Sequence, residues 1–222
     1  MVIYIFIYYY YINYYINYYI NYYINYYINI YLLLYLYMGQ YYLAIILSDI
    51  KRTTEIIRLW MSPHNYNNGA KLTEHSYIGN NFVQAFEHLI SPEGMFYMSR
   101  IVWAGDYAEP EKNNESDNLY TNVSNNYTGL FQCPKSHDTS SYRYIVNHSQ
   151  KVYVDKERCP KNEYNLILHP LPLLVSEGNG RGGGDYRGNN VELCGTWARD
   201  NISVEKTIHN DYNELVCDFI EE

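Results

Sequence analysis

The fold is decided by the stretch Tyr41-Tyr42-Leu43-Ala44-Ile45-Ile46-Leu47-Ser48-Asp49-Ile50. A short apolar run that ends in a polar Ser-Asp pair is typical of a buried β-strand. Residues 55–61 alternate more loosely between polar and apolar side chains. They predict a second strand that pairs with the first as a hairpin across residues 51–54.

The chain before this stretch is a low-complexity repeat of Tyr, Ile and Asn, with Asn at every fourth position from 13 to 29. Codons written with A and T alone encode all three residues, so the repeat resembles a translated twelve-nucleotide microsatellite. We therefore expect that the protein starts at Met38 rather than at Met1. Residues 1–37 then form an extension, and residues 38–222 have the size of a single globular domain.

Two other interpretations of the N-terminal region stay open. Residues 1–48 carry no charge, and residues 31–47 are apolar enough to suggest a membrane segment. The regularly spaced Asn side chains would need polar partners inside a bilayer, which disfavours that interpretation. The composition also suits a low-complexity arm. Membrane association is expected only if residues 1–47 are translated.

A helix is predicted over residues 81–90. Its apolar side chains recur at helical spacing, at Phe82, Phe86 and Leu89, and Asn80 or Asn81 can cap its start. Its polar face is predicted to carry Gln84, Glu87 and His88. The spacing of this segment is the clearest helical signal in the domain.

The remaining predicted elements are mainly extended. They comprise a short piece at 71–77, a strand at 98–107, a hairpin of 142–146 with 151–155, and a strand pair within 191–204. Residues 109–141 are polar and rich in Asn, Ser and Glu, which predicts a mobile insertion. The predicted fold class is α+β, with a mainly antiparallel sheet and one or two helices.

Charge and cysteine content narrow the classes of function. The formal net charge is −8, and every charged residue follows Ser48. An acidic domain without a basic stripe is a poor match for a phosphate backbone, so nucleic-acid binding is disfavoured. The four cysteines, at 133, 159, 194 and 217, show no C-x₂-C spacing. They predict free thiols rather than a metal site or a disulfide framework.

A glycine-rich loop over residues 177–188 is the main candidate binding site. Glycines allow the backbone to approach a ligand and can form an anion-holding nest, and arginines can add bidentate hydrogen bonds. The spacing matches neither a P-loop nor a dinucleotide fingerprint. A structural surface loop is therefore the competing interpretation. The candidate ligand-binding residues here are Arg181, Gly182, Gly183, Gly184, Asp185 and Arg187.

Two further candidates lie outside this loop. If the predicted strand ends converge, Asp106, Asp185 and Asp200 would gather with nearby arginines, and grouped carboxylates can serve acid–base work. The competing interpretation is that these Asp residues cap turns. His64 lies in a turn sequence and is the best placed of the histidines. No His-Glu-x-x-His or Gly-x-Ser-x-Gly motif is present, so no metal, cofactor or nucleophile is assigned.

Several runs resemble an uncharacterised protein family of large amoeba-infecting DNA viruses. They are Met38-Gly39-Gln40-Tyr41-Tyr42, the run from Trp60 to Tyr66, Val102-Trp103-Ala104-Gly105-Asp106-Tyr107, and the block from His169 to Gly188. The resemblance covers most of residues 38–222 and none of the repeat. It implies an intracellular viral protein, located in the host cytoplasm or in the virion. It brings no activity, ligand or catalytic residue with it.

The sequence alone therefore favours a non-catalytic viral accessory or interaction protein with an unknown protein partner. The alternative is an enzyme or binding domain for a phosphorylated or anionic small molecule at the 177–188 loop. A third hypothesis is a membrane-anchored protein that uses residues 1–47.

Overall fold

The computed structural model describes residues 19–24, 26–27, 40–49, 55–111, 117–125, 129–178, 184–208 and 210–220. The chain divides into two compact units, Met1–Gly39 and Gln40–Glu222. In the first unit, residues 19–24 and 26–27 are helical, and their Tyr and Ile side chains are exposed. Most of the segment proposed above as a membrane span lies outside the described residues. Within the described part, none of the helices is both long and apolar enough to span a membrane.

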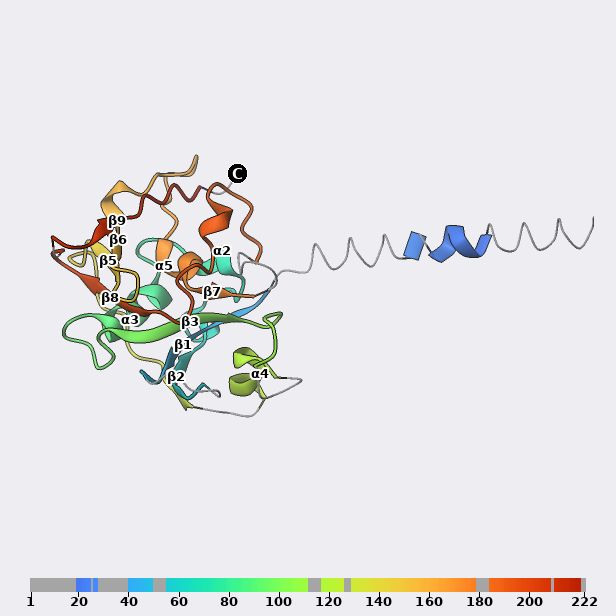
Figure 1. The fold of residues 1–222 in the computed structure, drawn as a ribbon, viewed down its shortest axis with the longest axis horizontal. Helices are drawn as coiled ribbons and strands as arrows, with labels where there is room; N and C mark the ends of the chain where they lie inside the picture. Colours follow the sequence, from blue (N-terminus) through green and yellow to red (C-terminus); the bar gives the residue numbers. More distant parts are fainter. Residues whose placement is uncertain are drawn as a thin grey trace, which may run out of the picture. The chain divides into compact units, whose positions relative to one another are not determined.

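The second unit is built on a mixed sheet of nine strands in the described residues (Figure 1). Five of the strand pairings are antiparallel and three are parallel. The order across the sheet is β4-β2-β1-β3-β8-β5-β6-β9, and β7 pairs with β3. The predicted α+β class is confirmed. The strands are β1 (Tyr42–Leu47), β2 (Ile57–Met61), β3 (Ser99–Gly105), β4 (Leu130–Phe131), β5 (Tyr144–Asn147), β6 (Val152–Asp155), β7 (Ser176–Glu177), β8 (Asn201–Glu205) and β9 (Asn213–Glu214).

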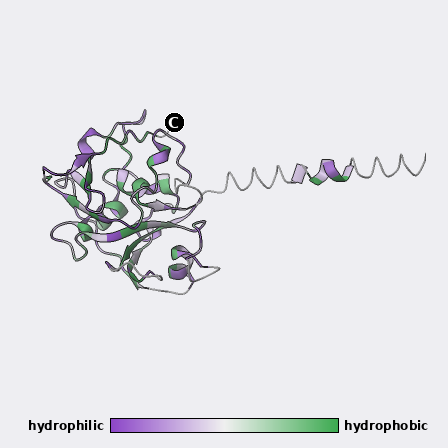
Figure 2. Cartoon of the chain, in the orientation of Figure 1, coloured by the Kyte–Doolittle hydropathy of each residue, from purple (hydrophilic) through white to green (hydrophobic). Residues whose placement is uncertain are grey.

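Strand β1 lies between β2 and β3 and is buried on both faces. Because successive side chains of a strand point to opposite sides, its residues divide between two hydrophobic clusters. Ala44 and Ile46 belong to one cluster, while Leu43 and Ile45 belong to the other. Figure 2 shows hydrophobic residues along these central strands. Neither face of β1 meets water, so apolar residues are required at every position rather than at every second one. This is why the strand appears in the sequence as an uninterrupted apolar run.

The first face of the sheet is covered by α3 (Asn81–Ile90) and α5 (Pro170–Leu174) (Figure 1). Helix α3 has the predicted bounds. The Asn80 side-chain oxygen accepts the backbone N–H of Phe82 at 2.9 Å, which satisfies a donor that the first helical turn leaves unpaired. The predicted polar face is wrong at one position, because Glu87 is buried rather than exposed to solvent.

The second face is covered by α4 (Leu119–Ser124), which lies within the polar segment 109–141. Leu119 and Val123 are buried against the side chains of the central strands. The Asn118 side-chain oxygen caps the helix by accepting the N–H of Thr121 at 2.9 Å. Part of the segment, at 112–116 and 126–128, lies outside the described residues. Its mobility stays a prediction, but α4 closes the core.

Two predicted extended pieces are wrong. Residues 71–77 instead contain the short helix α2 (Leu72–His75), whose start is closed by Glu74, because its carboxylate accepts the backbone N–H of Lys71 at 2.9 Å. The predicted strand pair within 191–204 is a 3₁₀ turn, η3 (Val191–Leu193), followed by further turns and by β8 alone. Positive φ angles at Gly195 and Arg199 bend the chain there, which a continuous strand cannot accommodate.

Candidate functional site

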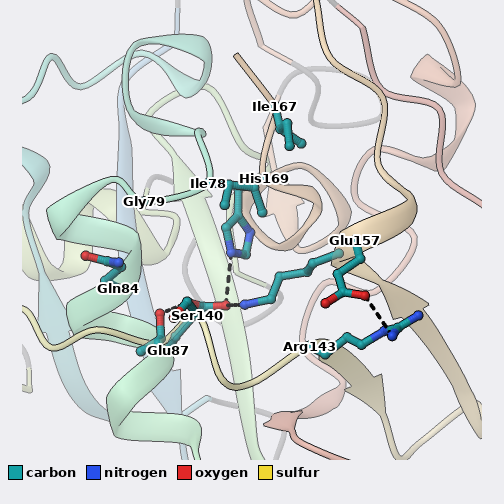
Figure 3. Close-up of a pocket in the computed structure, with 11 residues that line it drawn as sticks. Ile78, Gly79, Gln84, Glu87, Ser140, Arg143, Glu157, Ile167 and His169 are labelled. Atoms are coloured by element: carbon teal, nitrogen blue, oxygen red, sulfur yellow. Dashed lines mark hydrogen bonds and ion pairs between the residues drawn. The ribbon is translucent and has the colours of Figure 1, made fainter. Parts of the chain in front are cut away.

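A cavity of about 220 Å³ lies between α3, the 3₁₀ turn η2 (Lys156–Arg158) and the start of α5 (Figure 3). Four segments that are distant in sequence contribute its walls. The lining residues are Ile78, Gly79, Gln84, Glu87, Thr139, Ser140, Arg143, Lys156, Glu157, Ile167 and His169. Ionisable side chains therefore line a hollow beside the hydrophobic core.

The Glu87 carboxylate is the centre of this site. Its Oε1 accepts a hydrogen bond from Lys156 Nζ at 2.5 Å and one from His169 Nε2 at 2.9 Å. Its Oε2 accepts the hydroxyl of Thr139. All four residues are buried. Both carboxylate oxygens are thus engaged, which is the condition under which a buried charge is tolerated.

His169 is held in one tautomer. Pro170 has no backbone N–H, so the first N–H of α5 belongs to Leu171, and it donates to His169 Nδ1 at 3.2 Å. A ring nitrogen that accepts a hydrogen bond carries no proton, so the proton is on Nε2 and is donated to Glu87. Burial lowers the pKa of His169 despite the nearby carboxylate, which favours the neutral ring.

Glu87 and Lys156 form a buried ion pair. Burial alone would raise the pKa of Glu87, but His169 and Lys156 together lower it to about 2. The ammonium of Lys156 has three N–H donors. Among the described residues, Glu87 Oε1 is the only acceptor that it contacts. Two of the three N–H groups of Lys156 therefore remain as donors for a ligand in the cavity.

The outer part of the cavity combines one more ion pair with apolar side chains. Arg143 pairs with Glu157 at 2.7 Å and also donates from Nε to Asp155 at 2.8 Å. Figure 3 shows the Arg143–Glu157 pair on one side and Ile167 on another. The Gln84 carbonyl oxygen accepts the hydroxyl of Ser136 at 3.1 Å, which leaves its amide N–H groups as donors.

The structure brings several of the predicted site residues together at a different place, around Tyr42. Asp106 accepts the backbone N–H of Tyr41 at 3.1 Å, and Asp185 accepts the backbone N–H and the hydroxyl of Thr73. Burial is the main cause that raises the pKa of Tyr42, and Asp185 and Asp106 raise it further while Arg187 lowers it. Asp106, Asp185 and Arg187 therefore all act on Tyr42, and each of the two carboxylates accepts hydrogen bonds from a segment distant in sequence.

The described part of the glycine loop packs closely against buried side chains. A Cβ atom on Gly184 would lie 2.6 Å from the Tyr42 hydroxyl, and one on Gly178 would lie 1.9 Å from Gln40 Oε1. Arg187 is exposed and donates to the carbonyl oxygen of Gly184 at 2.7 Å. These contacts match the structural interpretation of the loop. The candidates Arg181, Gly182 and Gly183 lie outside the described residues.

The other predicted candidates lie elsewhere. His64 is exposed in η1 (Pro63–Tyr66). Asp200 does not join Asp106 and Asp185, because it accepts the side-chain amides of Asn147 and Gln150. Arg199 pairs with Glu111 and Glu177 at 2.5 and 2.7 Å, so it fixes β7 to the segment after β3. The grouping of all three Asp residues with arginines is therefore wrong.

Sequence reasoning missed the cavity residues. Glu87 is 69 positions from Lys156 and 82 positions from His169, and no motif joins them. The one local signal was His169 directly before a proline, which predicts a helix cap once α5 is known.

Comparisons of the chain with known protein families, with curated proteins and with solved structures give no significant match. In the described residues, no group of three or more His, Cys, Asp and Glu side chains is arranged to hold a metal ion. All four cysteines are free, as predicted, and Cys133 is the exposed one.

Proposed function

We propose that this chain is a non-catalytic interaction protein that binds a protein partner, in the host cytoplasm or in the virion. The observation that carries the proposal is the pairing inside the cavity. Lys156 and His169 both donate to the Glu87 carboxylate, and both ring nitrogens of His169 are engaged. A general base needs a free lone pair within reach of a substrate proton, and His169 offers none.

Other buried side chains that could act in catalysis are also unsuited to it. His75 uses both ring nitrogens, one to Gly69 and one to Trp103. Burial raises the pKa of the Cys159 and Cys194 thiols to about 12, so the nucleophilic thiolate is scarce at neutral pH. These groups therefore support packing rather than chemistry.

The surface offers an apolar feature that suits a protein partner. The turn between α3 and β3 exposes three neighbouring side chains, Met95, Tyr97 and Met98, with exposed fractions of 83%, 42% and 39%. Met and Tyr are enriched where proteins bind one another, and methionine adapts to irregular surfaces. We name residues 95–98 the apolar turn and propose that it contacts the partner.

The alternative function, an anion site at the glycine loop, gains no support from the described residues. The Asp106 and Asp185 carboxylates near Tyr42 would repel an anion. Arg187 donates instead to backbone carbonyl oxygens of its own loop, at Gly184 and Tyr186.

The test is retention of partners from a lysate of infected host cells on the immobilised chain. Met95→Glu should lower the retention of specific partners because it places a charge in the apolar turn, and the melting temperature should not change. Tyr164→Glu is the matched control, since Tyr164 is an exposed aromatic residue that does not belong to the apolar turn. Equal retention by both variants and the wild type would refute the proposed surface. Conversion of any lysate compound by the wild type, but not by Glu87→Gln, would refute the non-catalytic function.

A further inference from the structure

We propose that the cavity beside Lys156 is a binding site for a small uncharged molecule that carries a carbonyl or hydroxyl oxygen and a short branched apolar group. This inference does not depend on the apolar turn or on the partner that it binds. It rests on the donors, the charge balance and the apolar walls of the cavity.

The donors come first. The buried ammonium of Lys156 uses one of its three N–H groups on Glu87, and among the described residues it has no second acceptor. The side-chain amide of Gln84 also lines the cavity. Its Oε1 accepts from Ser136, and its two N–H groups are further donors. A buried donor without a partner is costly, so an oxygen acceptor in the cavity would be favourable.

The charges decide against an ionic ligand. Glu87 and Lys156 neutralise each other, and Arg143 faces two carboxylates, Asp155 and Glu157. An anion on Lys156 would meet the adjacent Glu87 carboxylate in a site of low dielectric. A cation would meet the ammonium itself. A neutral ligand can accept from Lys156 and leave the Glu87 pair intact.

Size and shape define the rest of the ligand. Ile78 and Ile167 provide the apolar surface of the cavity, on segments before α3 and before α5. The volume of about 220 Å³ is below the range of about 300–1,000 Å³ for drug-sized ligands, so the molecule must be small. A branched alkyl group next to a carbonyl group meets both requirements.

Three probes of equal shape test this class: isobutyramide, isobutyrate and isobutylamine. Each is titrated into the full chain and observed by saturation-transfer NMR. We expect saturable binding of isobutyramide at millimolar concentration, with isobutyrate and isobutylamine at least about tenfold weaker, which is about 1.4 kcal/mol. Saturable binding of an ionic probe alone, or of none of the three, would overturn the proposal.

A variant locates the binding. Ile78→Trp fills the cavity from its rim, since Ile78 is 39% exposed, and it leaves the Glu87 pair untouched. Isobutyramide binding should disappear in this variant at an unchanged melting temperature. Ile56→Trp is the matched control, because Ile56 is 42% exposed and does not line the cavity. If both variants bind isobutyramide as the wild type does, the probe binds elsewhere and the site is refuted.

Discussion

The indole Nε1–H of Trp103 donates a hydrogen bond to His75 Nε2 over 3.0 Å, and both side chains are fully buried. The opposite nitrogen, Nδ1, lies 3.1 Å from the carbonyl oxygen of Gly69. An indole N–H is only a donor and a carbonyl oxygen only an acceptor, so Nδ1 carries the proton and Nε2 does not. The ring is neutral, and a second proton on Nε2 would face the indole N–H.

Stability should therefore fall as the pH falls. Burial lowers the pKa of His75 to about 4 from 6.5, although the bond to Gly69 opposes the shift. The unfolded chain then binds a proton that the folded chain rejects between these values. About 3 kcal/mol of stability should be lost as the pH drops from 6.5 to 4, and His169 adds a loss of the same sign.

Urea unfolding measured at several pH values checks this prediction. In His75→Gln the amide can replace the donor and the acceptor of the ring but cannot titrate. Its stability should depend less steeply on pH within the same window. An identical slope for the wild type and His75→Gln would show that His75 is not the source.

The buried ion pair of Lys156 should matter far more than an exposed one. Lys156→Met leaves Glu87 buried without its cation, which should lower the free energy of unfolding by about 3–5 kcal/mol. Lys151→Met is the matched control, because the Lys151–Asp211 pair is largely exposed, and its loss should cost at most about 1 kcal/mol. Chemical denaturation of both variants gives the comparison. Similar costs would mean that the Glu87 site is open to water in solution.

Close packing at the glycine loop should be measurable by comparing two glycines that both have a positive φ angle. Gly184 and Gly79 both have positive φ angles, at 59° and 88°. A Cβ on Gly79 meets nothing within 4 Å, whereas one on Gly184 meets Tyr42 at 2.6 Å. Gly79→Ala should cost about 1–2 kcal/mol for the left-handed backbone alone. Gly184→Ala should cost clearly more, as measured by thermal unfolding, and equal costs would contradict the packing.

Local patterns predicted the elements that short-range physics determines. The apolar run of β1 and the helical spacing of α3, with its Asn80 cap, were sufficient to place both elements. The β5–β6 hairpin was also predicted, because its side chains alternate on either side of a four-residue turn. These three elements fix the α+β class.

Long-range partners decided what the sequence could not predict. The spacing of the helix predicts that Glu87 lies on its solvent-exposed face. It is buried instead because Lys156, His169 and Thr139, from distant segments of the chain, bind its carboxylate. The polar composition of residues 109–141 concealed the two apolar side chains that α4 presents to the sheet. A single sequence gives no pairing between segments, so neither feature could be derived from it.

The two ends of the sheet have a consequence for how these molecules behave at high concentration. The strands at its ends, β4 and β9, each contain two residues. A free strand edge is a template on which another chain can assemble, and its length sets how many backbone hydrogen bonds a newcomer can gain. Because both end strands are so short, a strand of another chain could form very few backbone hydrogen bonds with either end of this sheet. Of the residues in β4 and β9, only Glu214 is charged, and it pairs with Arg158, so the short length of both strands is the feature that limits edge-to-edge fibre growth.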